Sequence, residues 1–150
     1  MTAKQMTAKR HDIQGKIYLY RRVVQAKLFI DANYHNPIDL DAISGQAAFS
    51  QYHFIRLFSK IYGKTPHKYL TMVRIDQAKL LLKTDTPVQQ VCFAVGFDSI
   101  GSFTGLFKRH TGLTPAIYRQ EQLQRAEQIT TTPLQFIPNC FAQHNGWVKE

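Results

Sequence analysis

The sequence predicts an all-α fold, in which two helix-turn-helix subdomains are joined by a long connecting helix, about seven helices in all. The first observation is an internal repeat: residues 63–69, GKTPHKY, return 49 positions later as residues 112–118, GLTPAIY. The second is the spacing of apolar residues, which is closer to the 3.6-residue period of a helix than to the two-residue period of a strand. Two copies are too few for a solenoid, so the repeat indicates a duplicated compact module.

Helix boundaries in the first half of the chain follow from capping residues and one proline. A first helix is expected over residues 23–33, before Pro37, because the residue that precedes a proline resists the helical conformation. Asp39 and Ser50 carry side-chain oxygens that cap helix N-termini, so a second helix is expected after Asp39 and a third over about 51–62. The inward-facing residues of these two helices are expected to be Leu40, Ile43, Ala47, Phe54, Leu57, Phe58 and Ile61.

Each copy of the repeat marks the end of one helix and the start of the next. Gly63 and Gly112 are expected to end helices, since glycine adopts the left-handed C-cap conformation without strain. The Thr-Pro pair that follows each glycine supplies an N-cap and a first helical residue. These signals predict a connecting helix over residues 65–84. Further helix starts are expected at Pro87, at Asp98 or Ser99, and at Thr114.

The charge of the chain is strongly positive, at +9, with 19 Lys and Arg against 10 Asp and Glu. The excess lies in the first 119 residues, whereas residues 120–150 hold two basic and three acidic side chains. A positive field attracts polyanions such as nucleic acids, because each neutralised phosphate releases condensed counterions. Charge that only keeps the protein in solution is the alternative that composition leaves open.

Membrane and metal-binding classes are not indicated. No apolar run approaches the ~20 residues that cross a bilayer, so no membrane partner is predicted and a cytoplasmic location is expected. The two cysteines, Cys92 and Cys140, lack CxxC spacing, and Cys92 is expected in the core. Cys140 and His144 are only two potential zinc ligands, so no metal site and no cofactor are predicted.

Catalysis is not predicted either, and no residue is assigned a catalytic role. Residues 137–140, IPNC, resemble only faintly the Pro-Cys-His-Arg nucleophile of DNA alkyltransferases. Phe141 follows the cysteine where a histidine would activate the thiol. The sequence therefore indicates a protein that is not an enzyme.

The duplicated module suits duplex DNA. Each copy is a short helix, a tight turn and a second helix with a basic outer face, and in helix-turn-helix proteins the second helix lies in the major groove. A connecting helix of about 17 residues would span ~25 Å. Together with the bodies of the modules, it could separate the two second helices by ~34 Å, one turn of DNA, so that both enter successive major grooves.

Longer motifs point to a family. Residues 54–69 read F-x2-L-F-x4-G-x-T-P-x2-Y, residues 74–82 read R-x3-A-x2-L-L, and residues 91–119 read V-x3-V-G-F-x-S-x3-F-x3-F-K-x3-G-x-T-P-x2-Y-R. With these motifs, about residues 22–120 resemble the AraC/XylS family of transcriptional regulators. The resemblance implies a seven-helix DNA-binding domain that recruits RNA polymerase to promoters or blocks it there. Double-stranded DNA and RNA polymerase are therefore the expected partners.

The resemblance also implies a domain organisation. We expect a basic N-terminal arm at 1–21, a double helix-turn-helix domain at 22–120 and a C-terminal extension at 121–150. Within the domain, the first module is expected at 37–64, the connecting helix at 65–84 and the second module at 86–120. Most members add an effector-binding or dimerisation domain, for which this chain has no room, so it resembles the single-domain members. We expect a monomer on an asymmetric site.

The first module is expected to supply most of the sequence specificity. The resemblance places Tyr52, Ile55 and Arg56 at base-facing positions. Arg56 is the strongest candidate, because a guanidinium bonds bidentately to guanine O6 and N7, worth about 1–3 kcal/mol of discrimination. The alternative for Arg56 is a solvated surface arginine, and the alternative for Tyr52 is an ordinary amphipathic aromatic side chain. Phosphate contacts are expected from Ser50, Gln51, His53 and Lys60, although a partly buried His53 is also possible.

The second module departs from the family pattern. Its base-facing candidates are Ser102 and Thr104, and Gly105 stands where many members have a long polar side chain. We therefore expect a close approach to the DNA backbone with little sequence discrimination, and phosphate contacts from the helix start and the basic residues after it. Those phosphate candidates are Ser99, Lys108 and Arg109. Alternatively, the glycines accept another protein surface.

The N-terminal arm, the C-terminal tail and Arg74 each have two possible roles. The N-terminal arm could enter a minor groove, and the expected state is a mobile one. The tail after residue 129 carries aromatic residues and is expected to fold back on the domain, with partner binding as the alternative. Arg74 fits an ion pair as well as a phosphate contact. A protein-interaction module that keeps the fold, and binds DNA weakly or with a partner, is the alternative function for the whole chain.

Overall fold

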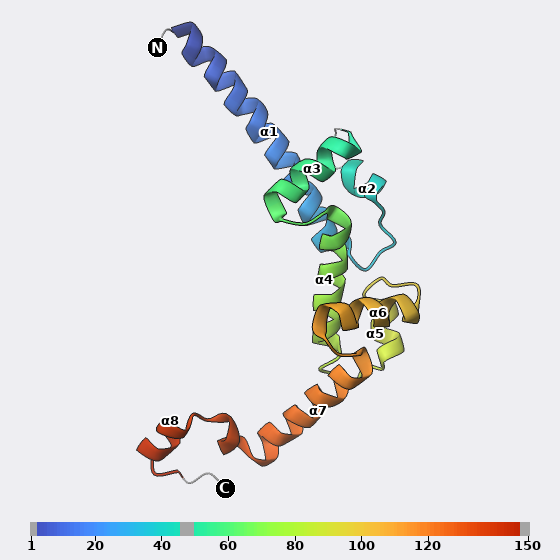
Figure 1. The fold of residues 1–150 in the computed structure, drawn as a ribbon, viewed down its shortest axis with the longest axis vertical. Coiled ribbons are helices and arrows are strands. Elements are labelled where there is room, and N and C mark those ends of the chain that lie inside the picture. Colours follow the sequence, from blue (N-terminus) through green and yellow to red (C-terminus); the bar gives the residue numbers. More distant parts are fainter. Residues whose placement is uncertain (1–2, 46–49, 148–150) are drawn as a thin grey trace.

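The computed structural model describes residues 3–45 and 50–147, which form helices and connecting turns without strands (Figure 1). The all-α prediction is therefore confirmed, while the inward-facing position expected for Ala47 lies outside the described residues. In chain order the elements are α1 (Ala3–Asn33), α2 (Leu40–Gly45), α3 (Gln51–Tyr62), α4 (Pro66–Leu81), α5 (Val88–Ala94), α6 (Ile100–Thr111), α7 (Pro115–Thr131), the 3-10 helix η1 (Pro133–Phe136) and α8 (Asn139–His144).

Two hydrophobic cores lie at the two ends of α4. The first is built from the C-terminal part of α1, from α2 and α3, and from Leu70 near the start of α4. The second is built from α5 and α6 and from Ile75, Ala78 and Leu82 towards the end of α4. The expected core position of Cys92 is confirmed, because the thiol is fully buried in the second core. One helix thus serves both modules, as a connecting helix should.

The internal repeat is visible in the packing of aromatic rings. In the first module the Phe58 ring lies 5.6 Å from Phe54 and 5.6 Å from Tyr69, measured between centroids. In the second, Phe107 lies 5.7 Å from Phe103 and 5.4 Å from Tyr118. All four contacts have edge-to-face geometry, the arrangement that aromatic quadrupoles favour. The repeated Phe, Phe and Tyr residues therefore form the same aromatic triad in both modules.

The predicted caps hold these helices in place. Gly63 and Gly112 follow α3 and α6 with φ values of 71° and 83°, in the left-handed region. Asp39 accepts a hydrogen bond from the backbone of Ala42 at 2.8 Å and so caps α2. The side-chain oxygens of Ser50, Thr65, Ser99 and Thr114 each accept a backbone N–H three residues on.

The N-terminal residues differ from expectation. Where a helix was expected only from residue 23, the structure has one 31-residue helix, α1, from Ala3 to Asn33, and the mobility expected of the arm stays a prediction. Its N-terminal half extends away from the modules (Figure 1). Few residues of 1–21 are core-forming, so no amphipathic pattern predicts a helix there, but good helix formers continue the helix from its packed half.

Two further expectations were wrong. Ile61 was expected on the core face of α3 but is 38% exposed, because in the last turn of the helix Tyr62 packs against the first core instead, its ring 4.7 Å from that of Phe58. The tail does not fold back on the modules: α7, η1 and α8 extend from the second module, at the opposite end from the start of α1 (Figure 1). The Arg125 guanidinium instead lies 5.9 Å from the ring centroid of Phe136 in η1, a local contact between α7 and η1.

Candidate nucleic-acid interface

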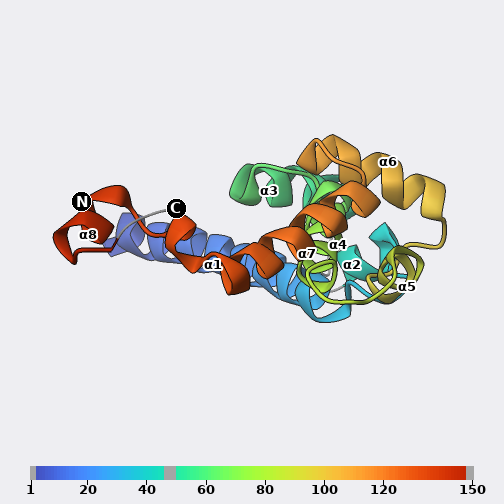
Figure 2. The same cartoon turned by 90° about the horizontal axis from the view of Figure 1, so that it is seen from below.

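The second helices of the two modules, α3 and α6, lie on the same side of the molecule. Figure 2 shows both along one edge, and Figure 1 shows them separated along the length of α4. We call α3 and α6 the reading helices. Their outward side chains face solvent together, which is the arrangement that lets two helices approach one face of a duplex.

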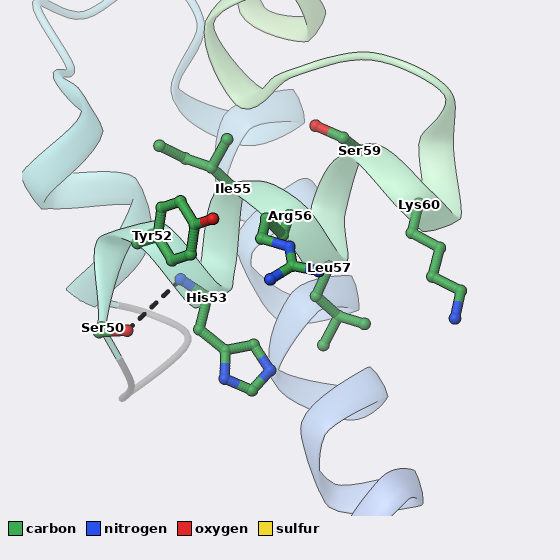
Figure 3. Close-up of a pocket in the computed structure, with 8 residues that line it drawn as sticks. All are labelled: Ser50, Tyr52, His53, Ile55, Arg56, Leu57, Ser59 and Lys60. Carbon is green, nitrogen blue, oxygen red and sulfur yellow. Dashed lines mark hydrogen bonds between the residues drawn. The ribbon is translucent and has the colours of Figure 1, made fainter.

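Tyr52 and Arg56 form the centre of the outward face of α3 (Figure 3). Tyr52 is 71% exposed and Arg56 is exposed beside it, one helical turn away. The guanidinium carbon of Arg56 lies 5.6 Å from the Tyr52 ring centroid, within cation–π range. The ring therefore restrains the guanidinium without removing any of its five hydrogen-bond donors. Lys60, one turn further on, is also exposed.

The other candidates of α3 are less free than these two. Ile55 is half-buried and packs against the first core, so only part of its side chain faces outward. Ser50 caps the helix, its Oγ accepting the His53 backbone N–H at 3.4 Å. The Gln51 amide donates to the Asp41 carboxylate in α2, which ties the two helices of the module together. His53 is exposed and lines the same groove as Arg56 (Figure 3).

On α6 the corresponding outward face is nearly bare. Counting back 49 positions, Gly101, Gly105 and Arg109 occupy the places of Tyr52, Arg56 and Lys60. A Cβ added at Gly105 would meet nothing within 4 Å, so the helix surface there is open. Ser102, Lys108 and Arg109 are exposed, and Thr104 is half-buried. The Ser99 hydroxyl oxygen caps α6 by accepting the Ser102 backbone N–H.

Sequence reasoning missed several residues of this face. Leu57 and Ser59 line the groove along α3, and the Ser59 hydroxyl is buried without a hydrogen-bond partner among the described residues. A second groove lies between the modules and is lined by Lys64 and Lys68, which had no assigned role. The signal was present in the sequence as basic residues at the start of α4, but only the fold brings them beside α6.

Metal-binding clusters and membrane-spanning helices are both lacking in the part of the chain that the structure describes. Among residues 3–45 and 50–147, no group of three or more His, Cys, Asp and Glu is placed to hold a metal ion. None of the described helices combines the length and the apolar content that crossing a bilayer requires. Burial raises the pKa of the Cys92 thiol, with a smaller contribution from Asp98, so this cysteine is a packing residue rather than a nucleophile.

Comparison with known proteins agrees with this geometry. A family model described as a helix-turn-helix domain matches residues 43–121. The chain is 33% identical over 93 residues to the HTH-type transcriptional activator AarP of Providencia stuartii, covering 61% of this chain and 69% of that protein. It is 36% identical over 93 residues to the bifunctional transcriptional activator/DNA repair enzyme AdaA of Bacillus subtilis, covering 61% of this chain and 44% of the relative.

Solved structures match over the same region. The DNA-binding domain of the global transcriptional factor AdpA, solved in complex with a target DNA, aligns with a TM-score of 0.68 at 30% identity, covering 71% of this chain and 96% of that domain. An AraC-type regulator from Chromobacterium violaceum aligns with a TM-score of 0.63 at 28% identity, covering 70% of this chain and 95% of the other. The chain spans only 32–58% of the length of the first curated relatives it matches.

Two capped helix-turn-helix modules on one connecting helix, with both reading helices on one face, define a double helix-turn-helix protein of the DNA-binding class. Within that class, the chain belongs to the AraC family of transcriptional regulators. The resemblance found in the sequence motifs is thereby confirmed.

Proposed function

We propose that the protein is a sequence-specific regulator of transcription that binds double-stranded DNA by inserting α3 and α6 into successive major grooves. The observation that carries the proposal is the placement of both reading helices on one side of the molecule, at the two ends of α4. At 1.5 Å per residue, the 16 residues of α4 span about 24 Å, a length that suits helices one DNA turn apart. The DNA complex of the similar AdpA domain supports duplex DNA as the ligand.

Specificity comes mainly from the first module. Arg56 reads a guanine, and Tyr52 restrains the Arg56 side chain or contacts a thymine methyl. Ile55 contributes an apolar edge at the rim of the first core. Ser50, Gln51, His53 and Lys60 lie towards the phosphates, where hydrogen bonds position the helix without reading bases.

The second module contributes affinity more than discrimination. Ser102 and Thr104 are its base-facing residues, and both are short. Ser99, Lys108 and Arg109 contact phosphates, while the open surface at Gly105 lets the helix approach the duplex closely. A base contacted by a short hydroxyl is discriminated less than one held by a bidentate guanidinium, because a hydroxyl serves as donor or acceptor.

The proposed partners are double-stranded DNA and RNA polymerase, and the proposed location is the cytoplasm. A single chain carries both reading helices, so one copy suffices for an asymmetric site of two unlike halves. Once bound at a promoter, the protein acts through contact with RNA polymerase or by excluding it. A regulator of this kind works where the chromosome is, in the cytoplasm.

Selection of binding sites from a random duplex pool tests this function. The purified chain should enrich an asymmetric motif that is sharp over one half and blurred about one helical turn away. Absence of enrichment, with only weak salt-sensitive binding to every duplex, would contradict sequence-specific regulation by the chain alone.

A second candidate function is protein interaction through the same fold. It is favoured by the bare face of α6 and by the exposed aromatic rings of the C-terminal extension, where Phe141 is 53% and Trp147 43% exposed. Salt dependence separates the two functions. Phosphate contacts make log affinity fall linearly with log salt concentration, whereas apolar association between proteins is far less sensitive to salt.

A further inference from the structure

A groove of about 520 Å³ lies between the two modules, and neither reading helix's base-facing residues form it. One wall is the turn after α3 and the first two turns of α4; the other is the C-terminal half of α6. Its lining residues are Lys64, His67, Lys68, Thr71, Met72, Leu106, Arg109 and His110. Of these, only Arg109 has been given a role above.

The groove is cationic at its rim and apolar at its floor. Lys68 and Arg109 are exposed, Lys64 is half-buried, and none of the lining residues is acidic. The histidines His67 and His110 are exposed at the same rim. Met72, Leu106 and the buried Thr71 form the floor between these basic side chains.

The positive charges at this rim lack anionic partners. Within residues 3–45 and 50–147, neither lysine nor Arg109 forms an ion pair, although ion pairs do form elsewhere, between Lys27 and Asp31 and between Lys79 and Asp76. The Lys64 ammonium instead lies 3.3 Å from the thioether sulfur of Met72, a weak acceptor. Three formal positive charges therefore converge on one groove without internal compensation.

The position of the groove decides what anion it meets. It lies between the C-terminal end of α3 and α6, and these two helices face the same side of the molecule (Figure 2). When two helices occupy successive major grooves, the stretch of duplex between them is a minor groove flanked by its two sugar-phosphate strands. An apolar floor suits deoxyribose, and a cationic rim suits the phosphates on either side of it.

We propose that this inter-module groove binds the sugar-phosphate backbone that crosses between the two half-sites, with Lys64 and Lys68 each neutralising a phosphate. The inference rests on the proposed function and adds to it a third contact region, which holds the centre of the site without reading its sequence. It increases affinity equally for every sequence, and it holds the duplex against the surface where α4 and α6 pack together.

The test uses the full chain, the duplex obtained by selection and a scrambled duplex of the same length. Affinity is measured for both from 50 to 200 mM salt for the wild type and for the double variant Lys64→Gln/Lys68→Gln. Lys68→Gln alone is compared with Lys83→Gln, a matched control at an exposed lysine beyond the other end of α4. Thermal unfolding followed by circular dichroism checks that each variant is folded.

The double variant is expected to reduce the slope of log affinity against log salt by about 1.8, at about 0.9 for each phosphate. The ratio of affinities for selected and scrambled duplex should stay unchanged, and Lys83→Gln should leave the slope as it is. An unchanged slope in a folded double variant would overturn the proposal, as would a fall in the affinity ratio, which would make these lysines readers of sequence.

A second arm locates the contact on the DNA. Methylphosphonates, which are uncharged, replace the phosphates midway between the half-sites of the selected duplex. The wild type should bind this duplex more weakly than the unmodified duplex. The double variant should bind the two duplexes with nearly equal affinity, since its groove no longer carries the two lysine charges that neutralise these phosphates. Equal losses in both proteins would place the central contact elsewhere.

A third arm distinguishes DNA from a free anion. Inorganic phosphate that binds the wild type but not the double variant, with unchanged salt slopes on DNA, would assign the groove to a small anion and overturn the proposal. If the wild type binds no duplex at all, both the proposed function and this inference fail. If the wild type binds a selected site and the lysine variants bind it in the same way as the wild type, the inference fails while the proposed function stands.

Discussion

Arg74, in the middle of α4, donates a hydrogen bond from Nε to the backbone carbonyl oxygen of Tyr34 at 2.7 Å. Its Nη2 donates to the carbonyl oxygen of Asn36 at 2.9 Å, and the guanidinium carbon lies 5.7 Å from the Phe97 ring centroid. The first two contacts reach the loop after α1 in the first module; the third reaches the second module. Arg74 therefore joins the modules, and neither of the roles that its sequence position allowed, an ion pair or a phosphate contact, describes it.

Burial at this junction affects the ionisation of Arg74 itself. Burial lowers the pKa of Arg74, although Asp98 opposes the shift, and the guanidinium remains charged because its ordinary pKa lies far above neutral pH. A half-buried cation that donates to two carbonyl oxygens is satisfied without a carboxylate partner. The relative placement of α3 and α6, on which the proposed groove insertion depends, is thus supported by two hydrogen bonds to the loop after α1 and by a cation–π contact with Phe97 of the second module.

Gly96 is the position where this junction can be broken most directly. Its φ is +96°, and a Cβ there would lie 2.6 Å from the Tyr34 carbonyl oxygen and 3.0 Å from Arg74 Nε. Gly96→Ala is expected to destabilise the protein by about 1–3 kcal/mol, since both the backbone conformation and the close contact become strained. Urea denaturation measures the change, and a variant as stable as the wild type would contradict the tight fit.

Much of the fold was predictable because its signals are local. Ser50 and Gly63 bound α3 through hydrogen bonds that reach only three or four residues, so sequence spacing is enough to place them. The repeated Phe-Phe-Tyr pattern fixed which faces of the helices are buried. The extent of α1 was not predictable in this way, because residues 3–22 continue a helix whose stability comes from packing further along the chain.

The candidate site was predictable only where one helix carries it. Tyr52 and Arg56 share a face of α3 by their spacing of four, and the structure leaves both exposed. Gln51 is proposed at a phosphate from its place on α3, whereas its hydrogen bond to Asp41, ten positions earlier in α2, was not predictable from that helix alone. The inter-module groove depends on Lys64 meeting Arg109 across 45 positions, and no pattern within either helix contains that relationship.

Gly105 offers the opposite case to Gly96. It lies inside α6 with open space around it, so alanine is sterically free there. Gly105→Ala is expected to stabilise the protein by about 1 kcal/mol, the difference in helix propensity between the two residues. Thermal unfolding checks the stability, and DNA titration checks the role: a more stable variant with weaker binding would mean that the glycine is present to let the backbone approach the duplex. Loss of stability would show that α6 is not a regular helix at this point.

The two cysteines should differ sharply in reactivity. Cys92 is fully buried, and burial raises the pKa of its thiol, so its thiolate is scarce at neutral pH. Cys140, in α8, is exposed. A thiol reagent in excess at pH 7 is expected to label one cysteine per chain rapidly, and the second only on the timescale of unfolding; Cys140→Ser should abolish the rapid phase. Two equally rapid phases would mean that the second core opens readily.

Arg56 provides the sharpest test of how the two modules divide their work. Its guanidinium is exposed and lies against the Tyr52 ring, so alanine at this position removes the proposed base contact without disturbing the core. Arg56→Ala is expected to reduce discrimination between selected and scrambled duplex by about 1–3 kcal/mol, roughly 5- to 150-fold, with the loss concentrated at one base pair. Arg56→Lys should recover the charge but not the bidentate geometry, and so restore affinity more than specificity.

The matched comparison is Thr104→Ala, since Thr104 occupies in the second module the position that Ile55 has in the first. Repeated site selection with each variant gives the readout. If Thr104→Ala erased the sequence preference while Arg56→Ala preserved it, the second module would be the principal reader and the proposed division would be reversed.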